Sequence, residues 1–287
     1  MNGYSVERPS RGVIQVRMDD VKSGWEQWIM FSSDRHFDSA HCDRALMKQQ
    51  LDKALERKAM IIDVGDFYDC MQGKFDPRRS YSGLRPEYKV DTYLDEIVSD
   101  AARFMKPYAG NILMIGRGNH DNGIIKNNGT DLISNLVYRL NADNGTNVQV
   151  GGYGGWIRFL FKISGHGQGM NIKYFHGSGG GGVVTRGVIQ TNRQAVYLPD
   201  ADVVVNGHIH DSYIVPISRE RLSIKGNPYQ DIIWFVRTPT YQDDYGDGTT
   251  GWHVERGAPP KPKGCAWMRL WCEDGKTVKS ECTLDLV

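Results

Sequence analysis

The 287-residue sequence predicts an α/β fold in which two packed mixed β-sheets are flanked by helices. In the first half of the chain, apolar runs of strand length alternate with helical patterns, which is typical of βα units around a largely parallel sheet. From about residue 147 the strand-like runs follow one another more densely, as expected for a second sheet packed on the first. Hydrophobic residues make up 40% of the chain, so a single domain over residues 1–287 can fill one sizeable core.

The individual elements follow from hydrophobic periodicity. Three apolar runs predict the first buried strands, at residues 28–31, 60–64 and 112–115. Three stretches with helical spacing predict helices at roughly residues 39–58, 94–105 and 132–140. Seven later runs predict strands at residues 156–163, 171–175, 203–205, 213–217, 232–236, 265–271 and 279–284. We expect the later strands to complete the second sheet.

Composition excludes several classes of protein. The formal net charge of +1 argues against a strongly basic nucleic-acid-binding surface, although a local basic patch fits within a balanced total. The five cysteines are odd in number and contain no C-x-x-C pair, so neither a complete disulfide framework nor a zinc ribbon is indicated. No apolar run has the length of a signal peptide or of a membrane span. These features favour a cytoplasmic protein with reduced thiols and no membrane contact.

Five short segments end apolar runs with residues that suit divalent metal ions. They are Asp34-Arg35-His36, Gly65-Asp66-Phe67-Tyr68-Asp69, Gly118-Asn119-His120-Asp121, His176 and Gly207-His208-Ile209-His210. In open α/β sheets the functional crevice lies beyond the carboxyl ends of the strands, where all these residues fall. Imidazole nitrogen combined with carboxylate and amide oxygen suits Zn, Mn or Fe, whereas thiolates would indicate structural zinc or an iron–sulfur cluster. The predicted chemistry is metal-assisted hydrolysis.

Each segment taken singly also has a non-functional explanation. Asp34 and His36 alone would more often lie in a solvated loop, and Asp66 alone would more often cap a helix. His208 and His210 would point to opposite faces of a regular strand, so both can bind one site only if the chain bends there, which the preceding glycine would permit. The metal-site prediction therefore depends on the combination and order of the five segments.

The order D-x-H, G-D-x-x-D, G-N-H-D, a lone His and G-H-x-H resembles the calcineurin-like metallophosphoesterase superfamily, from Asp34 to His210. The resemblance implies a four-layer α/β/β/α sandwich and two divalent metal ions, with Mn expected first and Fe, Zn, Ni or Mg as alternatives. It implies one ion held by Asp34, His36, Asp66 and His210. It implies a second held by Asp66, Asn119, His176 and His208, with Asp66 as the bridge.

The resemblance also implies roles in catalysis. His120 would be the general acid or a phosphate contact, and Asp69 would orient its imidazole. Two neighbouring cations lower the pKa of a bridging water and align its attack on phosphorus, and a protonated histidine can supply the proton that the leaving alkoxide needs.

Departures from subfamily patterns reduce the number of substrate classes to consider. Phosphoprotein phosphatases usually have Arg and Glu where this chain has Cys70 and Asp121, and purple acid phosphatases have a tyrosine where it has Asp69. The aromatic residues before Asp69 are similar to the nuclease branch and to some cyclic-nucleotide phosphodiesterases. We therefore expect a metal-dependent hydrolase of phosphodiesters, with DNA or RNA as the favoured substrate. The alternatives are a phosphomonoesterase, a small-nucleotide phosphodiesterase and, in another class, a non-catalytic metal-binding scaffold.

Two loops are candidates for substrate contact. Residues 71–89 hold five basic and two acidic side chains with interleaved aromatics including Tyr88, a composition that suits a phosphate backbone and stacked bases. Its candidate substrate-binding residues are Arg78, Arg79 and Arg85. A solvated loop with a few packed aromatics explains the segment equally well. Residues 241–263 form either a lid or a long turn.

Two further features are weaker candidates for a functional role. Residues 177–182 are glycine-rich but lack the Gly-Lys-Ser/Thr of a phosphate-binding loop, so we expect them only to let the backbone pass close to the metals. Arg117 contacts either phosphate or, more simply, a surface carboxylate. The sequence names no protein partner.

Overall fold

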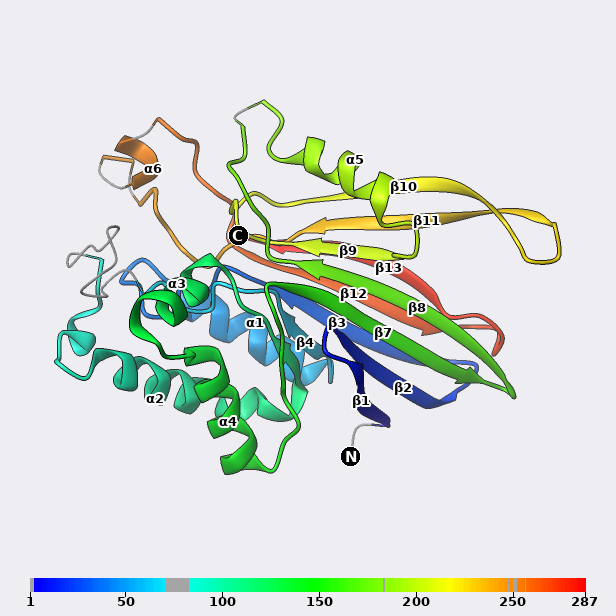
Figure 1. The fold of residues 1–287 in the computed structure, drawn as a ribbon, viewed down its shortest axis with the longest axis horizontal. Helices are drawn as coiled ribbons and strands as arrows, with labels where there is room; N and C mark the ends of the chain where they lie inside the picture. The colour runs from blue at the N-terminus through cyan, green and yellow to red at the C-terminus, as the bar shows by residue number, and fades with distance from the viewer. Residues whose placement is uncertain (1–2, 71–82, 183, 247, 250–251, 256) are drawn as a thin grey trace.

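Two mixed β-sheets form the centre of the molecule, with helices on both outer faces (Figure 1). The computed structural model describes residues 3–70, 83–182, 184–246, 248–249, 252–255 and 257–287. The predicted fold class, two packed mixed sheets flanked by helices, is confirmed.

The first sheet has six strands in the order β13-β12-β3-β4-β5-β6. Their bounds are β3 Trp25–Ser32, β4 Met60–Asp63, β5 Ile112–Ile115, β6 Gln149–Val150, β12 Gly264–Cys272 and β13 Lys279–Leu286. The strands from β3 to β6 are parallel, whereas β12 runs antiparallel to both β3 and β13. The carboxyl ends of β3, β4 and β5 therefore meet at one edge.

The second sheet has seven strands in the order β1-β2-β7-β8-β9-β11-β10. Their bounds are β1 Tyr4–Ser10, β2 Val13–Val21, β7 Gly154–Ile163, β8 His166–Phe175, β9 Val203–Asn206, β10 Tyr213–Leu222 and β11 Pro228–Arg237. β8 is parallel to β9, and β9 is parallel to β11. The ends of β8 and β9 thus also lie together.

The core has two large apolar clusters, one between the two sheets and one between the six-stranded sheet and its helices, and strand alternation explains both. In β3, Ile29 and Phe31 belong to the cluster between the sheets, whereas Met30 belongs to the cluster beneath the helices. Successive side chains of a strand point to opposite faces, so a strand buried on both faces is apolar throughout. This is why the central strands were recognisable as continuous apolar runs.

Helices cover the outer faces unequally. The helices are α1 Arg44–Glu56, α2 Tyr93–Met105, α3 Asn119–Asn128, α4 Leu132–Asn144, α5 Val188–Tyr197 and the short α6 Trp252–Glu255, with 3₁₀ turns at Pro86–Tyr88 and Lys106–Asn111. Buried residues of α1 to α4 pack against the six-stranded sheet. The segment around α5 packs on Val204, Ile233 and Phe235 of the seven-stranded sheet. The result is a four-layer arrangement.

The structure corrects two expectations about the sheets. The run at residues 28–31 is not the first strand, because β1 and β2 precede it. Ile14, Val16 and Met18 alternate toward the core, but polar residues between them interrupt the apolar run. The last two strands do not complete the second sheet. They return to the first one, where β12 pairs with the otherwise open edge of β3.

Helices α3 and α5 were not expected, because Asn, Gly and Gln residues dilute their apolar periodicity. All five cysteines are free and buried. Within the residues that the structure describes, no helix combines the length and apolarity needed to cross a membrane.

Candidate metal centre

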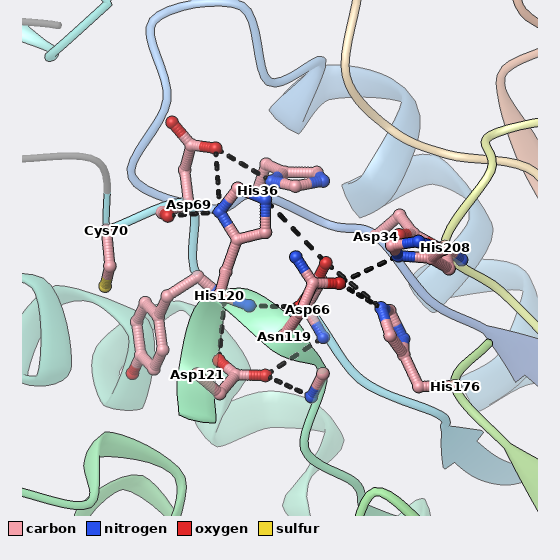
Figure 2. Close-up of polar contacts among 12 residues, drawn as sticks. Asp34, His36, Asp66, Asp69, Cys70, Asn119, His120, Asp121, His176 and His208 are labelled. Atoms are coloured by element: carbon pink, nitrogen blue, oxygen red, sulfur yellow. Dashed lines mark hydrogen bonds and ion pairs between the residues drawn. The ribbon is translucent and has the colours of Figure 1, made fainter. Parts of the chain in front are cut away.

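The seven predicted metal ligands converge from both sheets. Asp34 follows β3, Asp66 follows β4, and Asn119 opens α3 just beyond β5. His176 follows β8 and His208 follows β9, so each of these positions lies at a strand's carboxyl end. Figure 2 shows the side chains of six of them, Asp34, His36, Asp66, Asn119, His176 and His208, gathered in one place. The seven side chains form two groups.

The first group contains Asp34, His36 and His210, whose candidate ligand atoms lie within 4.8 Å of one another. The His36 and His210 Nε2 atoms are 3.2 Å apart, and His210 Nε2 is 3.5 Å from Asp34 Oδ1. His36 Nδ1 lies 2.9 Å from Asp69 Oδ1. Because a carboxylate is only an acceptor, Nδ1 carries the proton in this contact and Nε2 of a neutral His36 presents its lone pair to the site.

The second group contains Asp66, His176 and His208, joined by Asn119. His176 Nε2 lies 3.1 Å from both Asp66 Oδ2 and Asn119 Oδ1, and His208 Nδ1 lies 2.8 Å from Asn119 Oδ1. The other nitrogen of His176 faces the Val64 carbonyl oxygen at 3.2 Å. This backbone contact fixes the ring with Nε2 directed inward, as is usual for metal-binding histidines.

The donor set fits divalent cations. Asp34 is fully buried, and its Oδ1 makes no regular hydrogen bond among the described residues, with His210 Nε2 3.5 Å away. A buried carboxylate oxygen without a donor is costly unless a cation satisfies it. The facing Nε2 atoms of His36 and His210 would likewise direct two lone pairs at one point when both rings are neutral. Both features are explained by an ion bound between them.

The electrostatics of the site point the same way. Burial would raise the pKa of Asp66, but His176 and His120 hold that pKa below its ordinary range. Burial would lower the pKa of His36, but the Asp69 carboxylate raises it to about 10. Burial opposes protonation of His176 as well, yet Asp66 raises its pKa to about 9. The buried carboxylates are therefore stabilised by nearby positive charge. Either protonated histidines or bound cations can provide it.

Backbone conformation is strained at the same residues. Nine non-glycine residues of the described chain have positive φ, and five of them are predicted ligands. These five are Asp34 (48°), His36 (45°), Asp66 (53°), His208 (79°) and His210 (57°). Such conformations cost roughly 1–3 kcal/mol each and tend to occur at functional sites. The predicted bend in G-H-x-H is therefore present, but it is made at the two histidines themselves.

Two glycines are required by the close approach of the chain to the carboxylates. A Cβ on Gly118 would lie 1.9 Å from Asp66 Oδ1, and one on Gly207 would lie 2.6 Å from Asp34 Oδ2. The motif glycines thus make room for the ligands.

His120 lies beside the two groups and is held differently from the expectation. Its Nδ1 is 2.6 Å from the backbone carbonyl oxygen of Asp69, and its Nε2 is 3.9 Å from Asp66 Oδ2. The Asp69 carboxylate is 2.9 Å from His36 Nδ1 but 3.5 Å from His120 Nδ1. Asp69 therefore orients His120 through its main chain, whereas its side chain orients His36.

Two buried carboxylates support the site and were not predicted to do so. Asp121 Oδ2 accepts hydrogen bonds from the backbone N–H groups of Asp66 (2.9 Å) and Gly118 (2.8 Å). Asp38 accepts from the backbone N–H groups of Asp69 (2.6 Å) and Cys70 (3.0 Å). Asp121 occupies the third position of α3, where an acidic residue is a recognisable helix-capping signal. No local pattern identified Asp38.

The proposed substrate arginines are only partly covered by the structure. Arg78 and Arg79 lie outside the described residues. Arg85 is described, and its guanidinium bonds the Glu87 carboxylate at 2.9 Å and the Ser39 carbonyl oxygen at 3.3 Å. Its charge is therefore partly engaged within the protein.

Tyr88 is not available for base stacking, and it is packed as the second explanation of this segment expects. Its side chain is buried and its hydroxyl donates to the Asp100 carboxylate. Arg117 pairs with Asp131 and thus has the simpler of its two predicted roles.

The segment from Tyr241 begins as part of the site's support. Tyr241 is fully buried, and its backbone N–H donates to the Asp34 carbonyl oxygen at 3.1 Å. Farther along, the buried His253 ring lies 6.4 Å from the His210 ring. Atoms of His210, Asp244 and His253 lie within 4.8 Å of one another. The segment therefore reaches the first group of ligands.

Comparison with known proteins gives weak likenesses. No family model and no curated protein matches the chain. Among solved structures, vacuolar protein sorting 29 from Cryptosporidium parvum is 14% identical, with a TM-score of 0.38. The matched region covers 91% of this chain and 100% of that protein's chain. A predicted phosphoesterase from Streptococcus pneumoniae TIGR4 is 14% identical, with a TM-score of 0.33, and covers 91% of each chain. Vps29 complexed with zinc from Entamoeba histolytica is 12% identical, with a TM-score of 0.35, covering 90% of this chain and 99% of its own. Likenesses at this level carry no functional argument.

Proposed function

We propose that this protein is a dinuclear-metal-dependent phosphoesterase that hydrolyses phosphodiesters, with nucleic acid as the first substrate to test. The observation that carries the proposal is the pair of buried ligand groups, Asp34-His36-His210 and Asp66-His176-His208, that meet beside His120. The order of the motifs, which resembles the calcineurin-like metallophosphoesterases, supports the same activity.

The ligand assignment follows the sequence motifs and the contacts of the site. One divalent ion would be held by Asp34, His36, Asp66 and His210. The other would be held by Asp66, Asn119, His176 and His208. Mn is the ion to test first, and Fe, Zn, Ni and Mg are the alternatives. When bound, the two ions would supply the positive charge that activates water and neutralises phosphoryl oxygens.

His120 has the position of a general acid. Its Nδ1 is occupied by the Asp69 carbonyl oxygen, so proton exchange with substrate would take place at Nε2. Its side chain is 15% exposed, whereas that of His176 is completely buried, so substrate can reach the His120 side of the site. A protonated Nε2 there would donate to the leaving oxygen.

The preference for nucleic acid depends on the composition of residues 71–89. Five basic side chains against two acidic ones suit a polyanionic backbone. Small nucleotide esters and phosphomonoesters lack a long backbone and would not need this loop. A panel of substrates separates these cases.

The decisive experiment measures metal content and hydrolysis together. Purified protein is loaded with Mn, Zn, Ni or Mg and assayed on single-stranded and duplex DNA, RNA, cyclic nucleotides and phosphomonoesters. Asp66→Asn removes the charge shared by the two ligand sets, so metal content and turnover should both fall, turnover by orders of magnitude. The matched control is Asp20→Asn, because the Asp20 side chain is 84% exposed.

Asp66→Asn with full metal content and near-normal turnover would refute the ligand assignment. A wild-type protein that binds metal but hydrolyses none of these esters would instead be the non-catalytic scaffold.

A further inference from the structure

A cavity of about 440 Å³ lies outside the residues assigned to metal binding. This volume is within the range of roughly 300–1,000 Å³ that small-molecule sites usually have. The cavity is lined by Arg186, Tyr245, Val254, Gly257, Ala258 and Pro259. Its walls thus come from the chain before α5 and from the segment around α6, which lie at the same end of the molecule (Figure 1).

Both walls connect directly to the first group of ligands. Val254 lines the cavity, and the preceding residue, His253, is in ring contact with His210 at 6.4 Å. Tyr245 follows Asp244, whose carboxylate is within 4.8 Å of the His210 and His253 nitrogens. The cavity wall is therefore connected to His210 through His253 and Asp244.

The opposite wall packs on the same histidine motif. A Cβ on Gly187, next to Arg186, would lie 2.6 Å from the Cδ1 atom of Ile209. Ile209 is the residue between His208 and His210. The guanidinium of Arg186 is thereby carried on backbone that contacts the metal-ligand loop.

The cavity and the proposed acid lie at opposite ends of the site. Imidazole contacts run in series from His120 to His36 (4.9 Å), from His36 to His210 (5.1 Å) and from His210 to His253 (6.4 Å). If His120 protonates the leaving oxygen, the leaving group departs at the His120 end. The cavity beyond His253 then faces the group that remains on phosphorus.

The lining indicates what this group is. Among the residues that the structure describes, the lining offers the cationic side chain of Arg186, the aromatic ring of Tyr245 and the apolar side chains of Val254, Ala258 and Pro259. Aromatic rings stack on nucleobases, and a guanidinium matches the carbonyl acceptors of a base edge or a phosphate. We propose that this cavity binds the nucleoside unit retained on the scissile phosphate, an inference that rests on the proposed phosphodiesterase function.

Two esters with the same leaving group test the proposal in Mn-loaded protein. The p-nitrophenyl ester of thymidine 5′-phosphate places a nucleoside in the retained position, whereas methyl p-nitrophenyl phosphate places only a methyl group there. Arg186→Ala and Tyr245→Ala should lower kcat/KM for the thymidine ester by roughly 5- to 100-fold, the usual worth of one stacked base. The methyl ester should be hydrolysed as by wild type. Tyr245→Phe keeps the ring and should keep activity on both esters.

Matched controls come from the exposed face of α5. Arg193 and Tyr197 are exposed and do not line the cavity, so Arg193→Ala and Tyr197→Ala should change neither ester. Equal losses on both esters, or no loss on either, would overturn the proposal. Thermal melting of each variant identifies a failure to fold.

Calorimetric binding of thymidine 5′-monophosphate separates this inference from the proposed function, because binding needs no turnover. Binding by wild type that weakens in Arg186→Ala and Tyr245→Ala supports the cavity even when neither ester is hydrolysed. Undiminished binding in both variants would refute the cavity even in an active enzyme.

Discussion

The His120 ring is fixed at one nitrogen, and its other nitrogen lies 3.9 Å from Asp66 Oδ2. The Asp69 carbonyl oxygen, 2.6 Å from Nδ1, sets the orientation of the ring. The predicted ligand His176 is also fixed through a backbone carbonyl, but its Nε2 faces Asp66 and Asn119 rather than solvent. Under the proposed function, the same chemical group would serve either as a ligand or as an acid, depending on what its second nitrogen faces.

His120→Asn should separate catalysis from metal binding. We expect both metals to remain bound while kcat falls by roughly 10²–10⁴, the usual contribution of a positioned acid. The loss should be smaller for p-nitrophenyl esters, because nitrophenolate leaves without protonation. Metal analysis and steady-state kinetics on activated and unactivated esters measure both effects.

The control for this variant is His166→Asn. The His166 side chain contacts the Lys276 carbonyl oxygen, and His166 lies at the start of β8, whereas the candidate site lies beyond the other end of that strand. It should leave kcat unchanged. Equal losses on activated and unactivated esters in His120→Asn would argue against the general-acid role.

At the scale of elements, the N-terminus of α4 stabilises the loop that carries Asn119. Asp131 caps α4 by accepting from the Ser134 backbone N–H at 3.1 Å. It also pairs with Arg117, which precedes Gly118 and Asn119 in the chain. The cap of one helix thereby anchors the motif loop before another.

Asp131→Ala should lower the free energy of unfolding by about 1–2 kcal/mol, the range for a lost N-cap. Burial raises the pKa of Asp131, but Arg117 and Ser134 lower it below its ordinary value overall. The folded pKa is thus below the unfolded one, so the stabilisation is fully present above the unfolded pKa of about 3.9 and disappears as pH falls through the folded pKa. Urea unfolding of wild type and variant at neutral pH and below about pH 4 should show the difference shrinking in acid.

Thr92→Ala is the matched control, because Thr92 occupies the N-cap of α2 without a side-chain capping hydrogen bond. Its unfolding free energy should equal that of wild type. A difference between Asp131→Ala and wild type that grew in acid would contradict the sign derived above.

At the scale of the whole molecule, the site joins two sheets that have separate strand ladders. Asp34 and Asp66 follow strands of the six-stranded sheet, whereas His176, His208 and His210 follow strands of the seven-stranded one. A cation that binds both sets links the layers in the folded state only. Ligands that bind only the folded state stabilise it.

Metal binding should therefore raise Tm. At a free Mn concentration of about 100 times Kd the expected stabilisation is roughly 2.7 kcal/mol, which corresponds to a shift of several degrees. Differential scanning calorimetry with Mn, and again after chelation, measures it. Asp66→Asn should show a smaller shift, and an undiminished shift in that variant would place the stabilising ion elsewhere.

Much of the candidate site was predictable, because the chemistry of each motif residue is evident from its side-chain type. The seven candidate ligands and His120 could be named from five segments, and the structure brings them together. The partners that hold them could not be named. Asp38 lies 31 positions from Asp69. The Asp69 carboxylate contacts His36 and its carbonyl oxygen contacts His120, and these contacts join atoms from different loops.

The sequence by itself determined the periodicity of the central strands and helices, the α/β class and the set of candidate metal ligands. These are local properties, since each follows from side-chain type and spacing within one segment. Tertiary structure alone decided that β12 joins β3, that β1 and β2 extend the second sheet, and that His253 reaches His210. Such pairings join segments far apart in the chain, and competing edges and faces offer similar local patterns, so only the packing of the whole core selects among them.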